Sequence, residues 1–171
     1  YNSHGIVFTL SSYDVTCSPS WYAQGCADGP NSQEEAMKTA LGVTPEHYMN
    51  AYYPDCAAHG LFGFATFPPG VSGQNSDPNH WDQGVVNGWN TVSGGDFCGN
   101  IAPCQGDTMV HEAGHYFGLY HTFQGGCSEE GDGVADTAPV SQPNYGQCGN
   151  PSSRSDDPTD SEGQQGITWR S

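Results

Sequence analysis

Hydrophobic and polar positions alternate in short runs along this chain, and the runs predict short strands and helices. Residues 5–10 are mainly β-branched and aromatic, which predicts an opening strand. Residues 32–35 read Ser-Gln-Glu-Glu, the spacing of a helix capping box, and apolar positions continue as far as Gly42. The pattern therefore predicts a short amphipathic helix whose apolar face is formed by Ala36, Met37, Ala40 and Leu41.

Two further apolar runs, residues 48–53 and 61–67, predict strands in the core of a sheet. Gly, Asn, Asp and Pro dominate residues 68–104, so we expect mostly loop there, with at most one short strand at Val85-Val86. After residue 122 no regular periodicity continues. Residues 149–171 include a long acidic low-complexity stretch and are expected to form a flexible tail.

The composition indicates one acidic folded domain. A chain of 171 residues with 35% hydrophobic content can form a single core. Three Lys and Arg residues against 19 Asp and Glu give a formal charge of −16, which repels nucleic acid and anionic lipid. The longest apolar run is too short to span a bilayer. We therefore expect no nucleic-acid partner and no membrane partner.

The seven cysteines include no C-x-x-C pair, which favours disulfides in an oxidising compartment over a cysteine-ligated metal. An odd count leaves one thiol over, and the pairing stays open beyond a suggestion such as Cys98 with Cys104. The chain begins at Tyr1 without a charged and apolar leader, so we expect that a signal peptide either has been removed or never lay in this stretch. The cysteines predict a secreted, extracellular protein.

Residues 111–121 carry the candidate chemistry. They read His-Glu-Ala-Gly-His-Tyr-Phe-Gly-Leu-Tyr-His, the H-E-x-x-H pattern continued to a third histidine. From the composition, the extended pattern arises by chance with a probability on the order of 10⁻⁴. A core helix with backbone-bonded histidines is the better interpretation of one such histidine, but not of three together. Asp107 or Thr108 is the expected N-cap of this helix.

Helix geometry explains the spacing. His111 and His115 lie one turn apart on one face, so both imidazoles can point at one metal ion. Glu112 projects about 100° from His111 and suits a base that reaches the water on that ion. His121 reaches the same ion only if the helix breaks, and Gly118 can adopt the left-handed conformation that ends a helix. Three imidazoles leave a fourth position open, as in catalytic zinc sites.

The extended signature resembles the metzincin zinc endopeptidases, and residues 118–127 and 131–137 are similar to the pappalysin branch of that family. Residues 48–53, 61–68 and 81–86 are similar to it as well. The resemblance implies an α+β, zincin-like fold, in which a twisted mixed sheet packs on the active-site helix and the C-terminal part is irregular. It implies a single catalytic domain over residues 1–171, with an N-terminal subdomain at 5–121 and the start of a C-terminal subdomain at 122–148.

The resemblance also implies residue roles. His111, His115 and His121 would bind Zn²⁺, and Glu112 would act as the general base and acid. An edge strand would pair with an extended peptide substrate through Gly63, Phe64, Ala65 and Thr66. Ca²⁺ would bind after the third histidine, at Asp132, Asp136 and Thr137; a solvated acidic turn is the alternative, because this loop does not have the EF-hand spacing.

The chain also departs from the family. Metzincins carry a methionine turn beneath the metal, whereas the methionines here are Met37, Met49 and Met109, all before His121. We expect that the chain is cut short or has diverged before its lower subdomain. His80, beside Trp81 and Asp82, is expected to be a loop residue rather than a fourth metal ligand.

These observations predict a secreted zinc endopeptidase that acts on protein or peptide substrates as a monomer. The alternative is a catalytically inactive zinc- and calcium-binding domain derived from a metalloprotease, which only cleavage assays would separate from the enzyme. A third interpretation, a secreted acidic calcium-binding protein with a chance motif, would bind no stoichiometric zinc.

Overall fold

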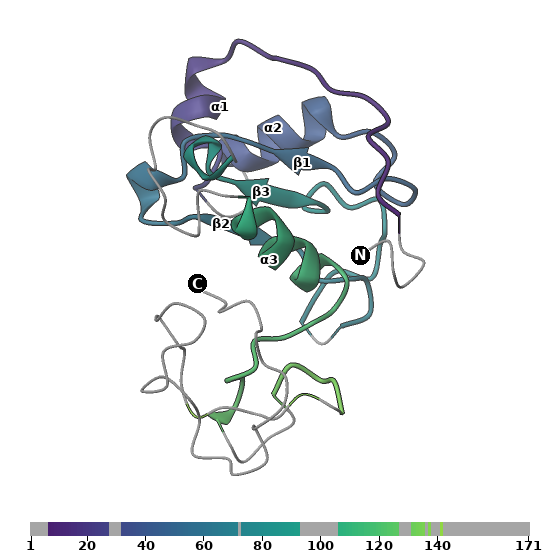
Figure 1. Ribbon diagram of the computed structural model, residues 1–171. Helices are drawn as coiled ribbons and strands as arrows, with labels where there is room; N and C mark the ends of the chain where they lie inside the picture. The colour runs from purple at the N-terminus through teal and green to yellow at the C-terminus, as the bar shows by residue number, and fades with distance from the viewer. Residues whose placement is uncertain are drawn as a thin grey trace.

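In the computed structural model of this protein, helices pack on a small mixed sheet (Figure 1). The structure describes residues 7–27, 32–71, 73–92, 106–126, 131–135, 137 and 141. The elements, in chain order, are α1 (Pro19–Gln24), α2 (Gln33–Leu41), β1 (Ala51–Tyr52), the 3₁₀ helix η2 (Ala57–His59), β2 (Gly63–Ala65), β3 (Val85–Asn87), the 3₁₀ helix η3 (Trp89–Thr91) and α3 (Asp107–Tyr116). This is a small α+β arrangement compatible with a zincin-like fold.

The sheet has the order β1-β3-β2. β1 runs parallel to β3, and β2 runs antiparallel to it, with Phe64 opposite Val86. All three residues of β3 are buried, because this strand has a neighbour on each side. Val85 and Val86, which were expected to form at most one short strand within a long loop, therefore lie in the central strand of the sheet. Within the described residues β2 lies at an edge.

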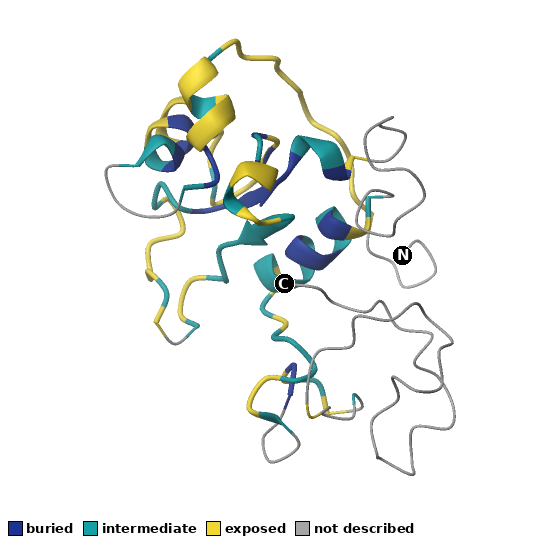
Figure 2. Cartoon of the chain, turned by 90° about the vertical axis from the view of Figure 1, so that its left-hand side faces the viewer, coloured by how far each residue is buried: buried dark blue, intermediate teal, exposed yellow. Residues whose placement is uncertain are grey.

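The helices cover both faces of the sheet. α3 contacts β2 and β3. On the other face, Cys26, Met37, Tyr52, Cys56 and Val86 form a buried cluster. Trp21, Leu41 and Phe64 pack against that cluster. Figure 2 shows the buried residues concentrated in the sheet and on the inner sides of the helices, and the outer side of α1 exposed.

A disulfide joins Cys26 and Cys56 inside this cluster, where both residues are almost fully buried. The bond links the end of α1 to the residue that precedes η2, so it ties the helical layer to the segment that leads into β2. Cys17 is exposed and free. The suggested Cys98–Cys104 pair lies outside the described residues.

The predicted α2 helix is confirmed, including its start and end. The Ser32 hydroxyl accepts a hydrogen bond from the Glu35 N–H at 3.2 Å, and the helix stops before Gly42. The expected apolar face is partly wrong, because Ala36 and Ala40 are exposed. The buried face instead contains Glu34, Met37 and Lys38. The two charged residues neutralise each other as an i,i+4 ion pair, which allows them to face the sheet.

The opening strand predicted at residues 5–10 is not formed over its described part, residues 7–10. Val7, Phe8 and Leu10 are between 54% and 77% exposed. A strand is stabilised by backbone pairing with a neighbour, and no such pairing of this segment occurs in the described structure. The strands predicted at 48–53 and 61–67 are confirmed but shorter, as β1 and β2. Their expected place in the core of the sheet is wrong, because both are outer strands within the described residues and Tyr52 is the one residue of the two strands that is buried. After residue 122, where no regular periodicity was expected, the described residues form neither α-helix nor strand; the expected tail lies outside the described residues.

Candidate metal centre

α3 begins at a glycine rather than at a capping side chain. Gly106 has φ +90° and ψ 1°, and no side chain caps the helix, so the expected N-cap at Asp107 or Thr108 is wrong. The chain enters the helix through a left-handed residue, a conformation that glycine adopts without a steric penalty. Asp107 then lies in the first turn, where its negative charge interacts favourably with the positive end of the helix dipole.

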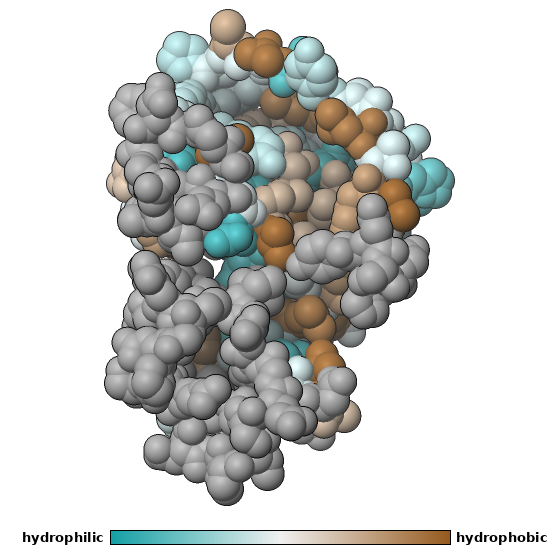
Figure 3. All heavy atoms as spheres, viewed as in Figure 1, coloured by the Kyte–Doolittle hydropathy of each residue, from teal (hydrophilic) through white to brown (hydrophobic). Residues whose placement is uncertain are grey.

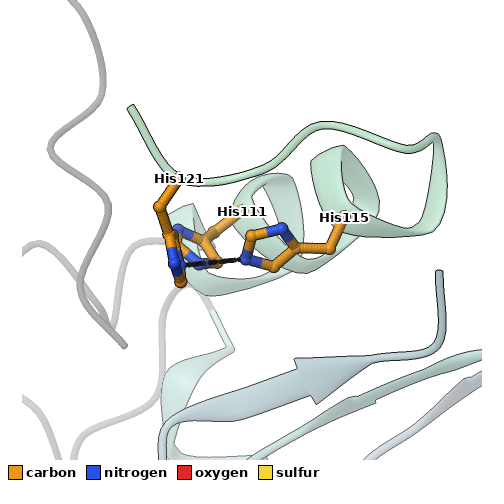
Figure 4. A group of neighbouring side chains, drawn as sticks. All are labelled: His111, His115 and His121. Atoms are coloured by element: carbon orange, nitrogen blue, oxygen red, sulfur yellow. Dashed lines mark hydrogen bonds between the residues drawn. The ribbon is translucent and has the colours of Figure 1, made fainter. Parts of the chain in front are cut away.

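The predicted helix break at Gly118 is confirmed. Gly118 has φ +95°. Its N–H donates to the His115 carbonyl at 2.8 Å, and the Leu119 N–H donates to the Gly114 carbonyl at 3.0 Å. This pair of bonds is the Schellman motif, which ends a helix and turns the chain. The turn brings residue 121 back alongside α3 (Figure 4).

The three histidines of the motif converge (Figure 4). Nε2 of His115 lies 2.9 Å from Nε2 of His111 and 3.1 Å from Nε2 of His121. Nε2 of His121 lies 3.3 Å from Nε2 of His111. His111 is 5% exposed, and the other two are half-buried. Two residues of one helical turn and one residue from the returning segment thus point one nitrogen each at a common position.

A backbone bond fixes the tautomer of the central histidine. Nδ1 of His115 lies 2.7 Å from the carbonyl oxygen of Leu119. A carbonyl only accepts hydrogen bonds, so Nδ1 carries the proton and Nε2 of the neutral ring presents a lone pair. This is the protonation that a metal ligand requires, and carbonyl partners of this kind commonly orient ligating histidines.

Burial keeps all three imidazoles neutral. Burial, together with the neighbouring His115 and His121, lowers the pKa of His111 to about 3. Burial, together with His115, lowers the pKa of His121 to about 4. The pKa of His115 is lowered by burial, against the opposing effect of the Leu119 carbonyl. A metal ion therefore need not displace protons from these rings near neutral pH.

The donor set fits a zinc ion. Zinc binds imidazole nitrogens at about 2.0–2.1 Å in tetrahedral geometry, which separates two such nitrogens by about 3.3 Å. The separations here, 2.9 to 3.3 Å, are close to that value. Three histidines of one chain also leave a tetrahedral position for another group, as in catalytic zinc sites.

Glu112 is buried between α3 and the face of the edge strand β2 that packs on this helix. It is 4% exposed, and burial raises its pKa to about 8. A β-carbon at Gly63 of β2 would lie 3.1 Å from Cγ of Glu112 and 3.0 Å from Cγ2 of Thr108. Gly63 therefore allows the strand to lie directly against α3 beside His111. The sequence motif gave no sign of this contact, because it joins residues 49 positions apart.

The free edge of β2 is adjacent to this helix. The Gly88 N–H donates to the Phe62 carbonyl at 2.7 Å, and the Thr66 N–H donates to the Gly84 carbonyl at 3.1 Å. Pairing alternates along an antiparallel ladder, so Phe62, Phe64 and Thr66 direct their backbone groups toward β3. Gly63 and Ala65 direct theirs outward. The residues expected to pair with substrate thus include two with outward-facing N–H and C=O groups.

Aromatic rings that the sequence motif did not identify pack around the histidines. Phe67, just after β2, lies 5.2 Å from His115 and 5.0 Å from Tyr120 between ring centroids. Phe123 stacks on His121 at 4.6 Å with an interplanar angle of 11°. Such contacts restrict ring orientation. The one sign of these ring contacts in the sequence is that the segments before and after the histidine motif contain several aromatic residues.

None of the other candidate residues in the described part of the chain belongs to the metal-binding group of the three histidines. His80 forms a 2.8 Å pair with Asp82 and belongs to no metal-binding group in the described part of the chain. Asp132 is buried, and its Oδ1 accepts a hydrogen bond from the Val134 N–H at 2.9 Å. The Thr137 N–H donates to the Val134 carbonyl, and Asp136 lies outside the described residues. The expected calcium site is therefore only partly described.

No helix in the described part of the chain has the length and apolar character needed to cross a membrane. Hydrophobic side chains do reach the surface, and several are visible in Figure 3. Exposed examples in the N-terminal segment include Val7, Leu10 and Val15. Phe8 of the same segment contacts the ring of Phe117, which follows α3, at 5.9 Å.

Comparison with known proteins identifies similar sequences. The family model described as pregnancy-associated plasma protein-A, a peptidase family, matches residues 33–154. An extracellular metalloprotease of Sordaria macrospora is 39% identical over 138 residues, covering 80% of this chain and 44% of the relative. A Neurospora crassa extracellular metalloprotease is 37% identical with the same two coverages. Extracellular metalloprotease 1 of Coccidioides posadasii is 35% identical over 147 residues, or 85% and 48%. The chain thus spans less than half the length of these relatives.

Proposed function

This chain belongs to the pregnancy-associated plasma protein-A family of peptidases, the pappalysins, and we propose that it is a secreted zinc endopeptidase of the metzincin type. The observation that carries the proposal is the convergence of three imidazole nitrogens within 3.3 Å of one another. Secretion is supported by the relatives, which are named extracellular metalloproteases, and by the Cys26–Cys56 disulfide. The substrate is a protein or peptide, and the enzyme acts as a monomer.

His111, His115 and His121 would hold the zinc ion. When bound there, zinc supplies a Lewis acid that polarises a carbonyl and makes water more acidic. The Leu119 carbonyl holds His115 in the ligating tautomer, and the stacked ring of Phe123 restricts His121. The histidines therefore need little reorganisation to bind a metal, which favours tight binding.

Glu112 would be the general base and acid. Its carboxylate takes a proton from the water that attacks the peptide carbonyl and then gives a proton to the leaving amine. A base must be ionised, and burial alone raises the pKa of Glu112 to about 8. A cation beside the carboxyl group favours the ionised form, so metal binding lowers this pKa and prepares the base.

The edge strand would bind the substrate backbone. Gly63 and Ala65 direct their N–H and C=O groups away from β3, so an extended peptide can add to the sheet as a further strand. Main-chain pairing orients the peptide without requiring one sequence. The close contact of Gly63 with Glu112 supports this role, because it brings the strand next to the proposed base.

Residues 5–121 form the N-terminal subdomain that carries the zinc helix, and residues 122–148 begin the C-terminal subdomain, both within one catalytic domain. Asp132, Asp136 and Thr137 would take part in a calcium site, for which the buried position of Asp132 is the supporting observation.

The test is zinc quantification combined with a peptide-cleavage assay on the chain of 171 residues. We expect about one zinc per chain and cleavage that stops with a chelator and returns with zinc. The Glu112→Ala variant should keep the metal and lose cleavage, because the histidine ligands remain. Stoichiometric zinc without cleavage of any peptide would indicate an inactive metal-binding domain, and absence of zinc would refute both functions.

A further inference from the structure

The single lysine of this chain, Lys38, is buried between α2 and the edge strand β2. Lys38 lies on the inner face of α2 and is 2% exposed. Its Nζ is 2.7 Å from Oε1 of Glu34, one helical turn earlier. The two arginines of the sequence, Arg154 and Arg170, lie outside the described residues, so Lys38 is the one Lys or Arg in the described part of a strongly acidic chain.

Lys38 contacts the edge strand and the loop before β3 at once. Its Nζ donates a hydrogen bond to the backbone carbonyl of Asp82 at 2.7 Å. The Thr66 hydroxyl donates to the same carbonyl oxygen. The ammonium also lies 5.4 Å from the ring centroid of Phe64, within the range of a cation–π contact. One buried cation therefore joins α2, residue 82 and both Phe64 and Thr66.

These contacts lie on the opposite face of the strand from the catalytic helix. Side chains alternate across a strand, so Phe64 points to the α2 layer, whereas a side chain at residue 63 would point to α3 and Glu112. β2 has a partner strand on one side alone within the described residues. The position of its free edge thus depends on what supports it from the α2 face.

Stability alone is a weak explanation for this arrangement. A buried ion pair contributes little net stability compared with a well-packed apolar pair of similar volume. What an apolar pair could not supply is the directed bond from Nζ to the Asp82 carbonyl and the contact of the charge with the Phe64 ring. The contact with Phe64 supports the edge strand directly, and the Asp82 carbonyl links Lys38 to the Thr66 hydroxyl at the end of that strand.

We propose that Lys38 is a positioning residue for substrate binding. It holds the edge strand β2 in the position, relative to the rest of the sheet, in which its free edge can pair with a peptide. The inference rests on the proposed function, since it assigns a role to the strand that would bind substrate. Lys38 touches neither the histidines nor Glu112 in any described contact, so it acts on peptide affinity and not on the proton transfer.

The test is the double variant Glu34→Met/Lys38→Met, which removes both charges together and keeps side-chain volume. We expect KM for a peptide substrate to rise roughly tenfold, the effect of losing one charge-assisted hydrogen bond, with kcat changed less than about twofold. Amide hydrogen exchange at Thr66, whose N–H bonds to Gly84, should become faster. The single variant Lys38→Arg keeps a buried cation and hydrogen-bond donor, so its KM should lie closer to that of the original chain than the KM of the double variant does. Thr39→Met, on the exposed side of α2, is the control and should change neither readout.

Two outcomes would overturn the proposal: a folded double variant with unchanged KM and unchanged Thr66 exchange, or one that loses kcat while KM stays the same. If the double variant does not fold, Thr66→Val removes the other donor to the Asp82 carbonyl and should raise KM in the same direction; no rise would refute the proposal. If the original chain cleaves no peptide, the proposed function fails, and Thr66 exchange in the double variant still decides whether Lys38 positions the strand.

Discussion

Gly63 of the edge strand and Glu112 of α3 are in such close contact that a residue with a β-carbon does not fit at position 63 without displacing its neighbours. A Cβ at residue 63 would lie 3.1 Å from Cγ of Glu112 and 2.7 Å from the carbonyl oxygen of Val86. The backbone oxygen cannot move aside without disturbing β3, the central strand. A glycine thus sets how closely the proposed substrate strand approaches the proposed base.

Substitution of Gly63 should reduce both the stability of the fold and the activity of each folded molecule. We expect Gly63→Ala to lower the free energy of unfolding by about 1–3 kcal/mol, the usual cost of overpacking. It should also reduce kcat/KM at least about tenfold, because the displaced strand no longer aligns a peptide with Glu112. Urea unfolding and peptide cleavage measure the two effects.

Gly25→Ala is the matched control for that experiment. Its Cβ would lie 2.5 Å from the carbonyl of Trp21 and 2.9 Å from Cβ of Pro54, so it is equally crowded. These contacts are in the α1 layer, remote from Glu112. We expect a similar loss of stability with unchanged cleavage per folded molecule; equal losses of activity in both variants would contradict a specific role of Gly63.

The raised pKa of Glu112 predicts a pH dependence of stability in the metal-free protein. The pKa is about 8 in the folded chain against an ordinary value of 4.5, so the folded state binds more protons between these values. Stability contributed by this group is full below pH 4.5 and is lost as pH rises through 8. Glu112→Gln removes the dependence. The variant should therefore gain at least about 1.4 kcal/mol over the original chain between pH 5 and pH 8 in urea unfolding with a chelator. A constant difference would show that Glu112 is not buried as described.

The lowered pKa values of His111 and His121 predict that metal-free stability rises with pH, opposite to the contribution of Glu112. Their pKa values are about 3 and about 4 in the folded chain against 6.5, so the unfolded chain binds more protons within that window. Metal-free stability should fall as pH drops from 6.5 toward 4, by at most about 1.4 kcal/mol per pH unit for each group. Measurement in the Glu112→Gln background removes the opposing contribution of the carboxyl group. His111→Gln/His121→Gln should flatten the slope, and an unchanged slope would assign it to other groups.

The turn at Gly118 predicts a separate effect on metal binding. Gly118 has φ +95°, and a Cβ there would meet only Pro68, at 3.5 Å and beyond. Gly118→Ala should therefore cost about 1–2 kcal/mol through backbone strain. It should also weaken zinc affinity at least about tenfold, because His121 is displaced from the other two histidines. Competition with a fluorescent zinc chelator measures the affinity.

Gly70→Ala is the matched control for the turn. Gly70 has φ +90°, and a Cβ there would meet no described atom within 4 Å, so the substitution introduces the same backbone strain outside the metal centre. It should lower stability and leave zinc affinity unchanged. Equal affinities for the Gly118→Ala variant and the original chain would show that the turn does not position His121.

Most features that depend on neighbouring residues were predictable from the sequence, with the start of α3 at Gly106 as an exception. Ser32 as the cap of α2, the end of that helix at Gly42, the spacing of His111 and His115 and the break at Gly118 all follow from hydrogen bonds and periodicity within one or two helical turns. The convergence of His121 followed from the same local geometry, because the turn spans only a few residues.

Features that depend on distant pairing were not predictable. The apolar run at residues 5–10 satisfies strand propensity, but its described part has no partner strand, and its side chains are exposed. The short Val85-Val86 run, placed within a loop region, is central because β1 and β2 both pair with it.

The amino-acid sequence alone was enough to predict the chemistry of the candidate metal centre, since three histidines and a glutamate within 11 residues are arranged by one helix and one turn. The surroundings of these side chains depend on the packing of the whole fold. The Gly63 contact with Glu112, the Phe67 ring on His115 and the burial of Lys38 beneath Phe64 join residues 26 to 49 positions apart. Such contacts arise when a sheet and its covering helices pack together, and no local pattern of hydrophobic and polar residues encodes which pairs will meet.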